Sequence, residues 1–163
     1  TALWLFPILK RQHEALALGY VAARIVECTF IAIGIVSLLA VVTLRQDVEA
    51  AAGSLTGAGE SLVAIHDWTF LLGPGWVVGV GNGLILGYLM YRSGLVPRGM
   101  AVLGLVGGTV LLIGGTAALF DVIEMDSALK ALSALPEAAW ELSLGIYLLA
   151  KGFKPSPILS VSV

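Results

Sequence analysis

Long apolar stretches constrain this chain more than any other feature of its sequence. Four of them, at about 14–44, 61–91, 98–120 and 136–151, contain few charged residues. The hydrocarbon core of a bilayer is crossed by about 20 apolar residues in a helix, so runs of this length predict spanning helices. We therefore predict an all-α fold, a polytopic bundle of four complete spanning helices that forms one integral membrane domain over 1–163.

The composition agrees with a membrane protein. Hydrophobic residues make up 58% of the chain and charged residues 12%, and the mean hydropathy is +0.97. A soluble domain of this length could not bury so much apolar surface. The net charge of −2 indicates no nucleic-acid partner, and the single Cys28 rules out a disulfide framework or a cysteine metal cluster. We expect membrane lipid as the surroundings, no cofactor and no metal.

Two of the predicted helices are longer than a bilayer requires. The runs 14–44 and 61–91 would each extend roughly 45 Å at ~1.5 Å per residue, so their ends should protrude, tilt or break. Gly73-Pro74-Gly75 predicts a break in the second run. Residues 1–9, which contain Pro7, read as the end of a preceding helix, so we expect the native protein to be longer at its N-terminus.

The distribution of basic residues predicts how the chain is threaded. Six of the nine Lys and Arg residues lie in the segments 10–13, 92–98 and 151–154. The intervening segments 45–60 and 121–137 are mostly acidic. Short loops rich in Lys and Arg stay cytoplasmic, so the C-terminus is predicted to be cytoplasmic. Trp68 and Trp140 are expected near the outer membrane boundary, where aromatic side chains gather.

Polar side chains inside the apolar runs form a predicted polar layer. Ionised groups in hydrocarbon are costly unless they are paired or hydrated, so Arg24 and Glu27 should face a protein interior. Counting about 1.5 Å per residue from the cytoplasmic ends places polar residues of four helices at a similar depth, about 15 Å. The members of this layer are Tyr20, Arg24, Glu27, Asn82, Thr109 and Glu141. Arg24 is expected at the centre, with Glu27 beside it on the same helix and Glu141 reaching it from another.

Three interpretations of this polar layer remain open. It can be an ion-pair network that locks the first and fourth spanning helices together. It can be a ligand, ion or proton site lined by Arg24, Glu27 and Glu141. Helix tilt can also separate the charges in depth, in which case no cluster forms.

Glycines recur at steps of four along the second predicted helix. They are Gly75, Gly79, Gly83 and Gly87, and Gly104 and Gly108 repeat the step once on the third helix. Small residues at this spacing let another helix approach closely. The partner can be a neighbouring helix of the same bundle, or a second copy or another subunit.

His66 and Asp67 raise the question of a metal or acid–base site at the outer end of the second helix. The only other histidine, His13, is predicted on the opposite side of the membrane, and only the carboxylates of 121–126 could join. A polar cap beside an interfacial Trp68 is the simpler interpretation. The glycines of 79–83 lie inside a predicted spanning helix, so they are not a nucleotide loop. No catalytic site is predicted, and we expect no enzyme.

Four segments resemble a bacterial family of membrane proteins known only as domain of unknown function 4386. They are LFPILKRQHEALALGYVAARIVE (5–27), HDWTFLLGPG (66–75), YRSGLVPR (91–98) and WELSLGIYLLAKGF (140–153). The resemblance implies a bacterial plasma-membrane protein of six helices, with one helix and most of a second preceding Thr1. Both termini would be cytoplasmic. The family has no known catalytic residues or substrate, so the resemblance implies no function.

Two functions are compatible with these features. The first is a non-enzymatic structural or accessory membrane protein, acting alone, as a homo-oligomer or with other membrane subunits, and stabilised by the polar layer. The second is a small transporter or ligand-binding membrane protein that uses the same layer as its site. The break expected at 73–75 favours the second, because transporters build binding sites at discontinuous helices.

Overall fold

The computed structural model describes residues 1–47 and 55–160, and the regular secondary structure of those residues is all helical. Its elements are α1 (Ala2–Leu9), α2 (Glu14–Asp47), α3 (Leu55–Leu72), η2 (Gly73–Val77), η3 (Gly79–Leu86), α4 (Gly87–Ser93), α5 (Arg98–Leu119), α6 (Ala128–Lys151) and α7 (Pro157–Ser160). The predicted all-α class is therefore confirmed.

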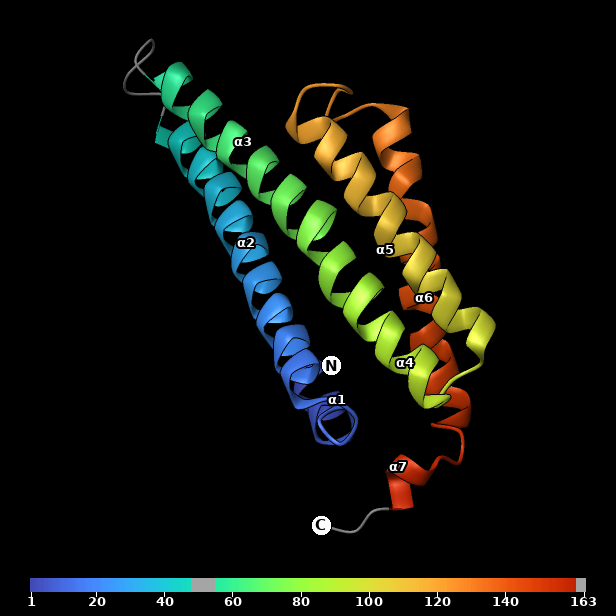
Figure 1. The fold of residues 1–163 in the computed structure, drawn as a ribbon. Coiled ribbons are helices and arrows are strands. Elements are labelled where there is room, and N and C mark those ends of the chain that lie inside the picture. Colours follow the sequence, from blue (N-terminus) through green and yellow to red (C-terminus); the bar gives the residue numbers. More distant parts are fainter. Residues whose placement is uncertain (48–54, 161–163) are drawn as a thin grey trace.

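Four long rods make up the bundle (Figure 1). The second rod is the continuous run of α3, η2, η3 and α4, and it lies between α2 on one side and α5 on the other. α6 packs antiparallel along α5. Because consecutive rods are joined by short connections, each runs opposite to its predecessor, as expected for an up-and-down bundle.

Three helical segments in the described part of the chain are long and apolar enough to cross a membrane. They are Glu14–Arg45, Gly57–Ser93 and Arg98–Leu119. The fourth predicted span lies in α6, which has 24 residues but carries Lys130, Glu137 and Glu141 within its length. These charges lower the average hydropathy of α6, so length and composition identify three candidate spans, and the predicted fourth is not confirmed.

The second rod widens where the sequence predicts a break. α3 passes at Gly73 into π-helical turns, and the backbone at Leu72 and Val78 keeps right-handed helical angles. Pro74 lacks an N–H, and the neighbouring glycines tolerate a looser winding, so the chain changes its hydrogen-bond pattern without leaving the helix. The expected discontinuity is thus a widened segment inside one continuous rod.

α6 begins earlier than the sequence analysis expected. Its first residue is Ala128, eight residues before Pro136, and Pro136 lies within the helix. Ser127 caps it, since its hydroxyl accepts from the backbone N–H of Lys130 at 3.3 Å. This cap forms the first turn ahead of the proline, so a region assigned to a loop is helical.

The three basic segments meet at one end of the bundle (Figure 1). The backbone N–H of Lys154 donates to the Leu95 carbonyl at 2.8 Å, and the Arg11 guanidinium donates to the Ile158 carbonyl at 3.2 Å. An apolar core gathers in this half of the molecule and includes Leu9, Ala17, Tyr20, Leu86, Leu89, Met90, Trp140 and Leu144. The fold therefore brings together the loops that the charge distribution assigned to one side of the membrane.

Candidate functional site

α6 buries two of its charged side chains and exposes most of its leucines. The residues that it buries include Lys130 and Glu137, which are 9% and 2% exposed. Its exposed face carries Leu129, Leu132, Leu135, Leu142 and Leu149. A helix at the surface of a water-soluble protein shows the opposite arrangement. Charges that face the bundle and leucines that face outward are what a lipid environment requires.

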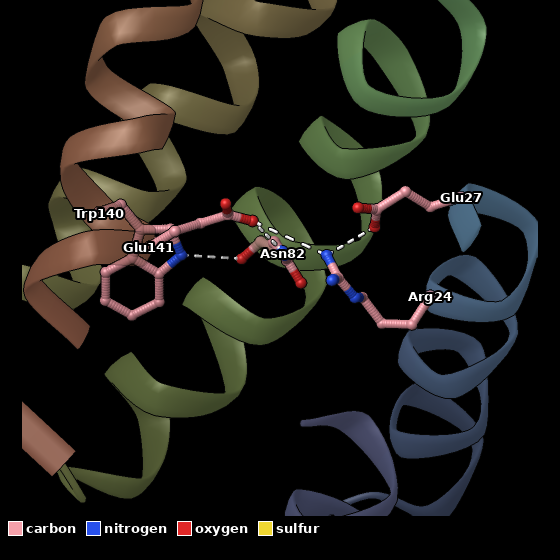
Figure 2. Close-up of polar contacts among 5 residues, drawn as sticks. All are labelled: Arg24, Glu27, Asn82, Trp140 and Glu141. Carbon is pink, nitrogen blue, oxygen red and sulfur yellow. Dashed lines mark hydrogen bonds and ion pairs between the residues drawn. The ribbon is translucent and has the colours of Figure 1, made fainter. Parts of the chain in front are cut away.

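The structure brings together Arg24, Glu27, Asn82 and Glu141, which we call the charged layer (Figure 2). The Arg24 Nη1 lies 2.5 Å from the Glu27 Oε2 on α2 and 3.8 Å from the Glu141 Oε1 on α6. The Asn82 amide donates to the same Glu141 oxygen. Glu27 is the close partner of Arg24, and Glu141 links the guanidinium to η3 and α6.

Trp140 completes the connection between η3 and α6. Its Nε1–H donates to the Asn82 carbonyl at 3.1 Å (Figure 2). That carbonyl also accepts from the backbone N–H of Gly87, five residues further on, which is the π-helical pattern. The indole is fully buried against Gly104, where an added Cβ would lie 2.6 Å from the ring. The expectation of Trp140 at the outer boundary is wrong, because the missing side chain at Gly104 lets the ring enter the core.

Glu137 is the buried acid that sequence reasoning missed. Within the described residues both of its carboxyl oxygens are buried without a hydrogen-bond partner. The Oε2 lies between Gly83 and Gly107. A Cβ added to Gly83 would lie 2.9 Å from this oxygen, and a Cβ added to Gly107 would lie 2.8 Å from it. Glu137 was predicted to lie in the acidic outer segment. Its i, i+4 spacing to Glu141 was the available signal, since that spacing puts both carboxyls on one face.

Thr109 does not belong to the charged layer, whereas Tyr20 lies within electrostatic range of Arg24, Glu27 and Glu141. Thr109 is exposed, and its hydroxyl donates to the Leu105 carbonyl of its own helix at 2.8 Å. Tyr20 is 1% exposed and is part of the apolar core. Counting residues gave Thr109 the right height, but Gly107 and Gly108 occupy the faces of α5 that contact the bundle.

The glycine steps pack helices within this chain. A Cβ added to Gly79 would lie 2.9 Å from the Gly108 carbonyl oxygen. A Cβ added to Gly108 would lie 2.6 Å from the Gly79 carbonyl oxygen. Gly83 and Gly87 also face the α5 backbone. Gly75 differs, since the nearest atoms to its Cβ position are the Lys130 ammonium nitrogen and the Phe70 carbonyl oxygen, both at 3.3 Å. The steps therefore serve the internal contact between the second rod and α5.

The paired glycines of α5 serve two neighbours at once. In the pair Gly107–Gly108, the first faces the Glu137 backbone on α6 and the second faces Gly79 and Gly83 on η3. Gly114 and Gly115 repeat this seven residues later, with Ser133 of α6 and Gly75 of η2 as their neighbours. Since seven residues make about two turns, both pairs present the same two faces.

The two histidines have structural contacts. The His66 Nδ1 lies 3.3 Å from the Gly34 carbonyl oxygen on α2. The His13 Nδ1 accepts from the backbone N–H of Leu16 at 3.3 Å, at the start of α2. Over residues 1–47 and 55–160, no three His, Cys, Asp or Glu side chains converge closely enough to hold a metal ion.

A charge imbalance is the chemical property that stands out in this part of the bundle. The charged layer and the adjacent Glu137 hold three carboxyl groups, and Arg24 is the one cation paired with them in the described structure. A carboxylate far from water and without a counter-charge is unstable unless a proton or a cation neutralises it. The arrangement can therefore take up positive charge.

The family model for a domain of unknown function (DUF4386) matches residues 1–152. The chain belongs to this family. The match spans all the long helices, the charged layer and Glu137, so the membership confirms the resemblance seen in the sequence. No curated protein and no solved structure matches the chain. The family description carries no activity, so the function of this member is argued from the site.

Proposed function

We propose that this protein is a small transporter or ligand-binding membrane protein whose buried carboxyl groups take up a proton or a small cation. The observation that carries the proposal is that one guanidinium pairs with two carboxyls while a third buried carboxyl, Glu137, has both oxygens unpartnered in the described structure. A purely structural network would favour balanced charges, because each unpaired buried charge costs stability. Excess acid at this depth is typical of proton relays and ion sites. No enzymatic activity is part of the proposal.

The exposure of the charged residues suggests a route to this site. The Glu141 and Arg24 side chains are 44% and 25% exposed, whereas Glu137 is enclosed by Gly83 and Gly107. Glu137 and Glu141 are about one helical turn apart on α6. A proton arriving at Glu141 would therefore reach the enclosed carboxyl in one step along the helix, directly or through a water molecule.

The widened helix beside the carboxyls is a second supporting feature. η3 contains Asn82 and Gly83, which contact Glu141 and Glu137 respectively. π-Helical turns concentrate at functional sites, and transporters use irregular helices to build binding sites near the membrane midplane.

The proposal includes α6 as a fourth span, in a plasma membrane with the C-terminus in the cytoplasm. Its 24 residues would extend roughly 36 Å at ~1.5 Å per residue, enough for a bilayer core. Its outward leucines support lipid contact, and the basic end of the bundle favours the cytoplasmic side. Further helices before Thr1, which the family resemblance implied, remain part of this proposal.

Infrared spectroscopy in nanodiscs tests the proton site. We expect a carbonyl band from a protonated carboxyl near neutral pH, and we expect Glu137→Gln to remove it. Glu60→Gln is the matched control, because Glu60 is exposed on α3 and its carboxyl should not contribute. Absence of the band from the parent protein, without a bound cation detected by mass spectrometry, would rule out the proposed site.

A transport assay then separates binding from translocation. Proteoliposomes with an internal pH-sensitive dye should acidify under an imposed proton gradient or membrane potential. Glu141→Gln should slow this acidification, because Glu141 is the exposed member of the carboxyl pair. Equal rates in protein-free liposomes would leave ligand binding as the function and exclude transport.

A structural or accessory role is the second candidate. Its specific support is the chain of contacts from Trp140 to Asn82, Glu141 and Arg24, which joins α6, η3 and α2. Native mass spectrometry on protein extracted gently from its own membrane distinguishes the two. A stoichiometric protein partner would favour the accessory role, and a lone chain would favour the first proposal.

A further inference from the structure

A second polar site lies away from the charged layer, toward the end of the bundle opposite the basic segments. A cavity of about 750 Å³ is lined by parts of α3, η2, α5 and α6 and by the connection that precedes α6. None of Arg24, Glu27, Asn82 or Glu141 lines it. Its volume is within the range of sites that bind small organic ligands.

Lys130 is the buried cation of this cavity. Only 9% of the residue is exposed. Its Cδ lies 3.9 Å from the position that a Cβ on Gly114 would occupy, and its Nζ lies 3.3 Å from the position that a Cβ on Gly75 would occupy. A lysine near a membrane boundary ordinarily extends its ammonium outward to water. Here the two glycines leave room for the side chain to run inward between α5 and η2.

The Lys130 ammonium has no acidic partner among the residues that the structure describes. The ion pairs found over residues 1–47 and 55–160 both belong to Arg24, so no carboxylate lies within 4.0 Å of the Lys130 Nζ. Its backbone N–H donates to the Ser127 hydroxyl at 3.3 Å and its backbone carbonyl accepts from the Ser133 hydroxyl at 2.6 Å, so both of these bonds leave the ammonium unused. A buried ammonium without a counter-charge is unfavourable, so an anionic group from a ligand would stabilise it.

The other residues that line the cavity include exposed acidic side chains and buried apolar side chains. Asp67 and Asp126 are exposed residues at the open side of the cavity. Leu71 and Leu111 are buried residues of its apolar wall. The cavity therefore presents one cation in its interior, carboxylates at its mouth and an apolar surface alongside.

We infer that this cavity binds a zwitterion with an apolar body. The anionic group contacts Lys130, the ammonium group lies toward Asp67 and Asp126, and the apolar part packs against the leucine wall. A simple anion would meet the two carboxylates, and a simple cation would meet the lysine, so only a ligand with both charges matches the lining. A phosphatidylethanolamine and a free apolar amino acid share this chemistry. The inference does not depend on the proton site proposed above.

Native mass spectrometry in nanodiscs tests the lipid source. Nanodiscs containing phosphatidylethanolamine and phosphatidylglycerol with the same acyl chains are compared, since the second lipid lacks the ammonium group. We expect the parent protein to retain phosphatidylethanolamine preferentially. Lys130→Met should weaken retention by about tenfold or more, the effect of losing a hydrogen-bonded charge. Lys151→Met, at the exposed end of the same helix, should leave it unchanged.

Calorimetric titration of the delipidated protein with leucine tests the other source. Binding that is lost in Lys130→Met would identify a free amino acid as the ligand, whereas retained phosphatidylethanolamine without leucine binding would identify the lipid. Either result supports the zwitterion site. The inference would be overturned if leucine did not bind and the parent protein also retained the two lipids equally.

A second variant separates binding from folding. Ala131→Trp should fill the cavity and block the probe while Lys130 stays in place, because Ala131 lines the cavity and is itself exposed. Asp126→Asn should reduce the preference for phosphatidylethanolamine over phosphatidylglycerol. Unchanged probe binding in a folded Ala131→Trp protein would show that the cavity is not the site.

Discussion

Arg24 is the residue on which the charged layer depends. Its guanidinium lies between Glu27 on its own helix and Glu141 on α6, so it compensates acid from two directions (Figure 2). The nearest guanidinium–carboxylate contact is short, and Glu27 is 6% exposed. Removal of the only paired cation would leave a surplus of carboxyls in the described layer.

Arg24→Met should therefore be strongly destabilising. Loss of one partner of a buried pair costs roughly 3–5 kcal/mol, and the 25% exposure of the Arg24 side chain favours the lower part of that range. Thermal unfolding in detergent measures the effect. Arg45→Met is the matched control on α2, where an exposed arginine should change stability by no more than about 0.5 kcal/mol. Equal melting of the two variants would contradict an essential role for the Arg24 pair.

Trp140→Phe tests the contact between α6 and the widened helix. The variant keeps a ring beside Gly104 but loses the donor to the Asn82 carbonyl, at a cost of about 1 kcal/mol for the hydrogen bond. Trp68→Phe is the control, because Trp68 is 42% exposed. The difference is read from thermal unfolding of both variants, and a larger effect at Trp68 would argue against the assigned contact.

At the scale of elements, α5 is the helix that closes the bundle. Its two glycine pairs let the backbones of η3 and α6 approach from two sides. In lipid there is no hydrophobic drive between helices, so close backbone contact and interhelical hydrogen bonds provide the association. α5 thus needs glycine on two of its faces, because η3 packs closely against one face and α6 against the other.

Gly107→Ala should disrupt the contact between α5 and α6. The new methyl group would lie 2.7 Å from the Glu137 nitrogen and 2.8 Å from its Cα, which are backbone atoms that cannot move independently. Overpacking of this kind costs about 1–3 kcal/mol. Gly145→Ala is the control, since nothing lies within 4 Å of its Cβ position. Thermal unfolding should separate the two variants, and equal stability would show that the helices do not meet as described.

α6 illustrates how a helix with a low average hydropathy can still suit a membrane. Its exposed face is rich in leucine, whereas Lys130 and Glu137 face α5 and the widened segments η2 and η3. Spin labels at Leu142→Cys and Leu149→Cys, in a Cys28→Ser background, should therefore be accessible to oxygen dissolved in lipid. A label at Leu144→Cys should be protected, because Leu144 is 6% exposed. Water accessibility along the leucine face would contradict α6 as a spanning helix.

At the scale of the whole molecule, the two ends of the bundle differ in charge. The basic segments meet at one end through contacts such as that of Lys154 with Leu95, and the connection before α6 places Asp121, Glu124 and Asp126 at the other. The positive-inside rule orients a chain with this asymmetry.

Cysteine labelling measures the orientation directly. In a Cys28→Ser background, Val122→Cys should react with a membrane-impermeant thiol reagent added outside intact cells, because Val122 is 74% exposed at the acidic end. Lys154→Cys should react only after the cells are opened. The reverse pattern would place the C-terminus outside.

The sequence by itself determined the all-helical class, the family and the order of the helices. It also predicted which end is basic and the height of Arg24, Glu27, Asn82 and Glu141. Height follows from residue number, because each residue of a helix adds a constant rise. The glycine steps likewise predicted close packing, although not which helix was the partner.

Only the tertiary structure decided which way each helix is turned. Thr109 had the expected height but faces away from the bundle, whereas Glu137 was assigned to the outer segment and Trp140 to the outer boundary, and both are buried. Lys130 points inward only because Gly75 and Gly114 leave space for it. The rotation of a helix about its axis results from the shapes of all its neighbours, and one linear sequence does not reveal those shapes before the helices are packed.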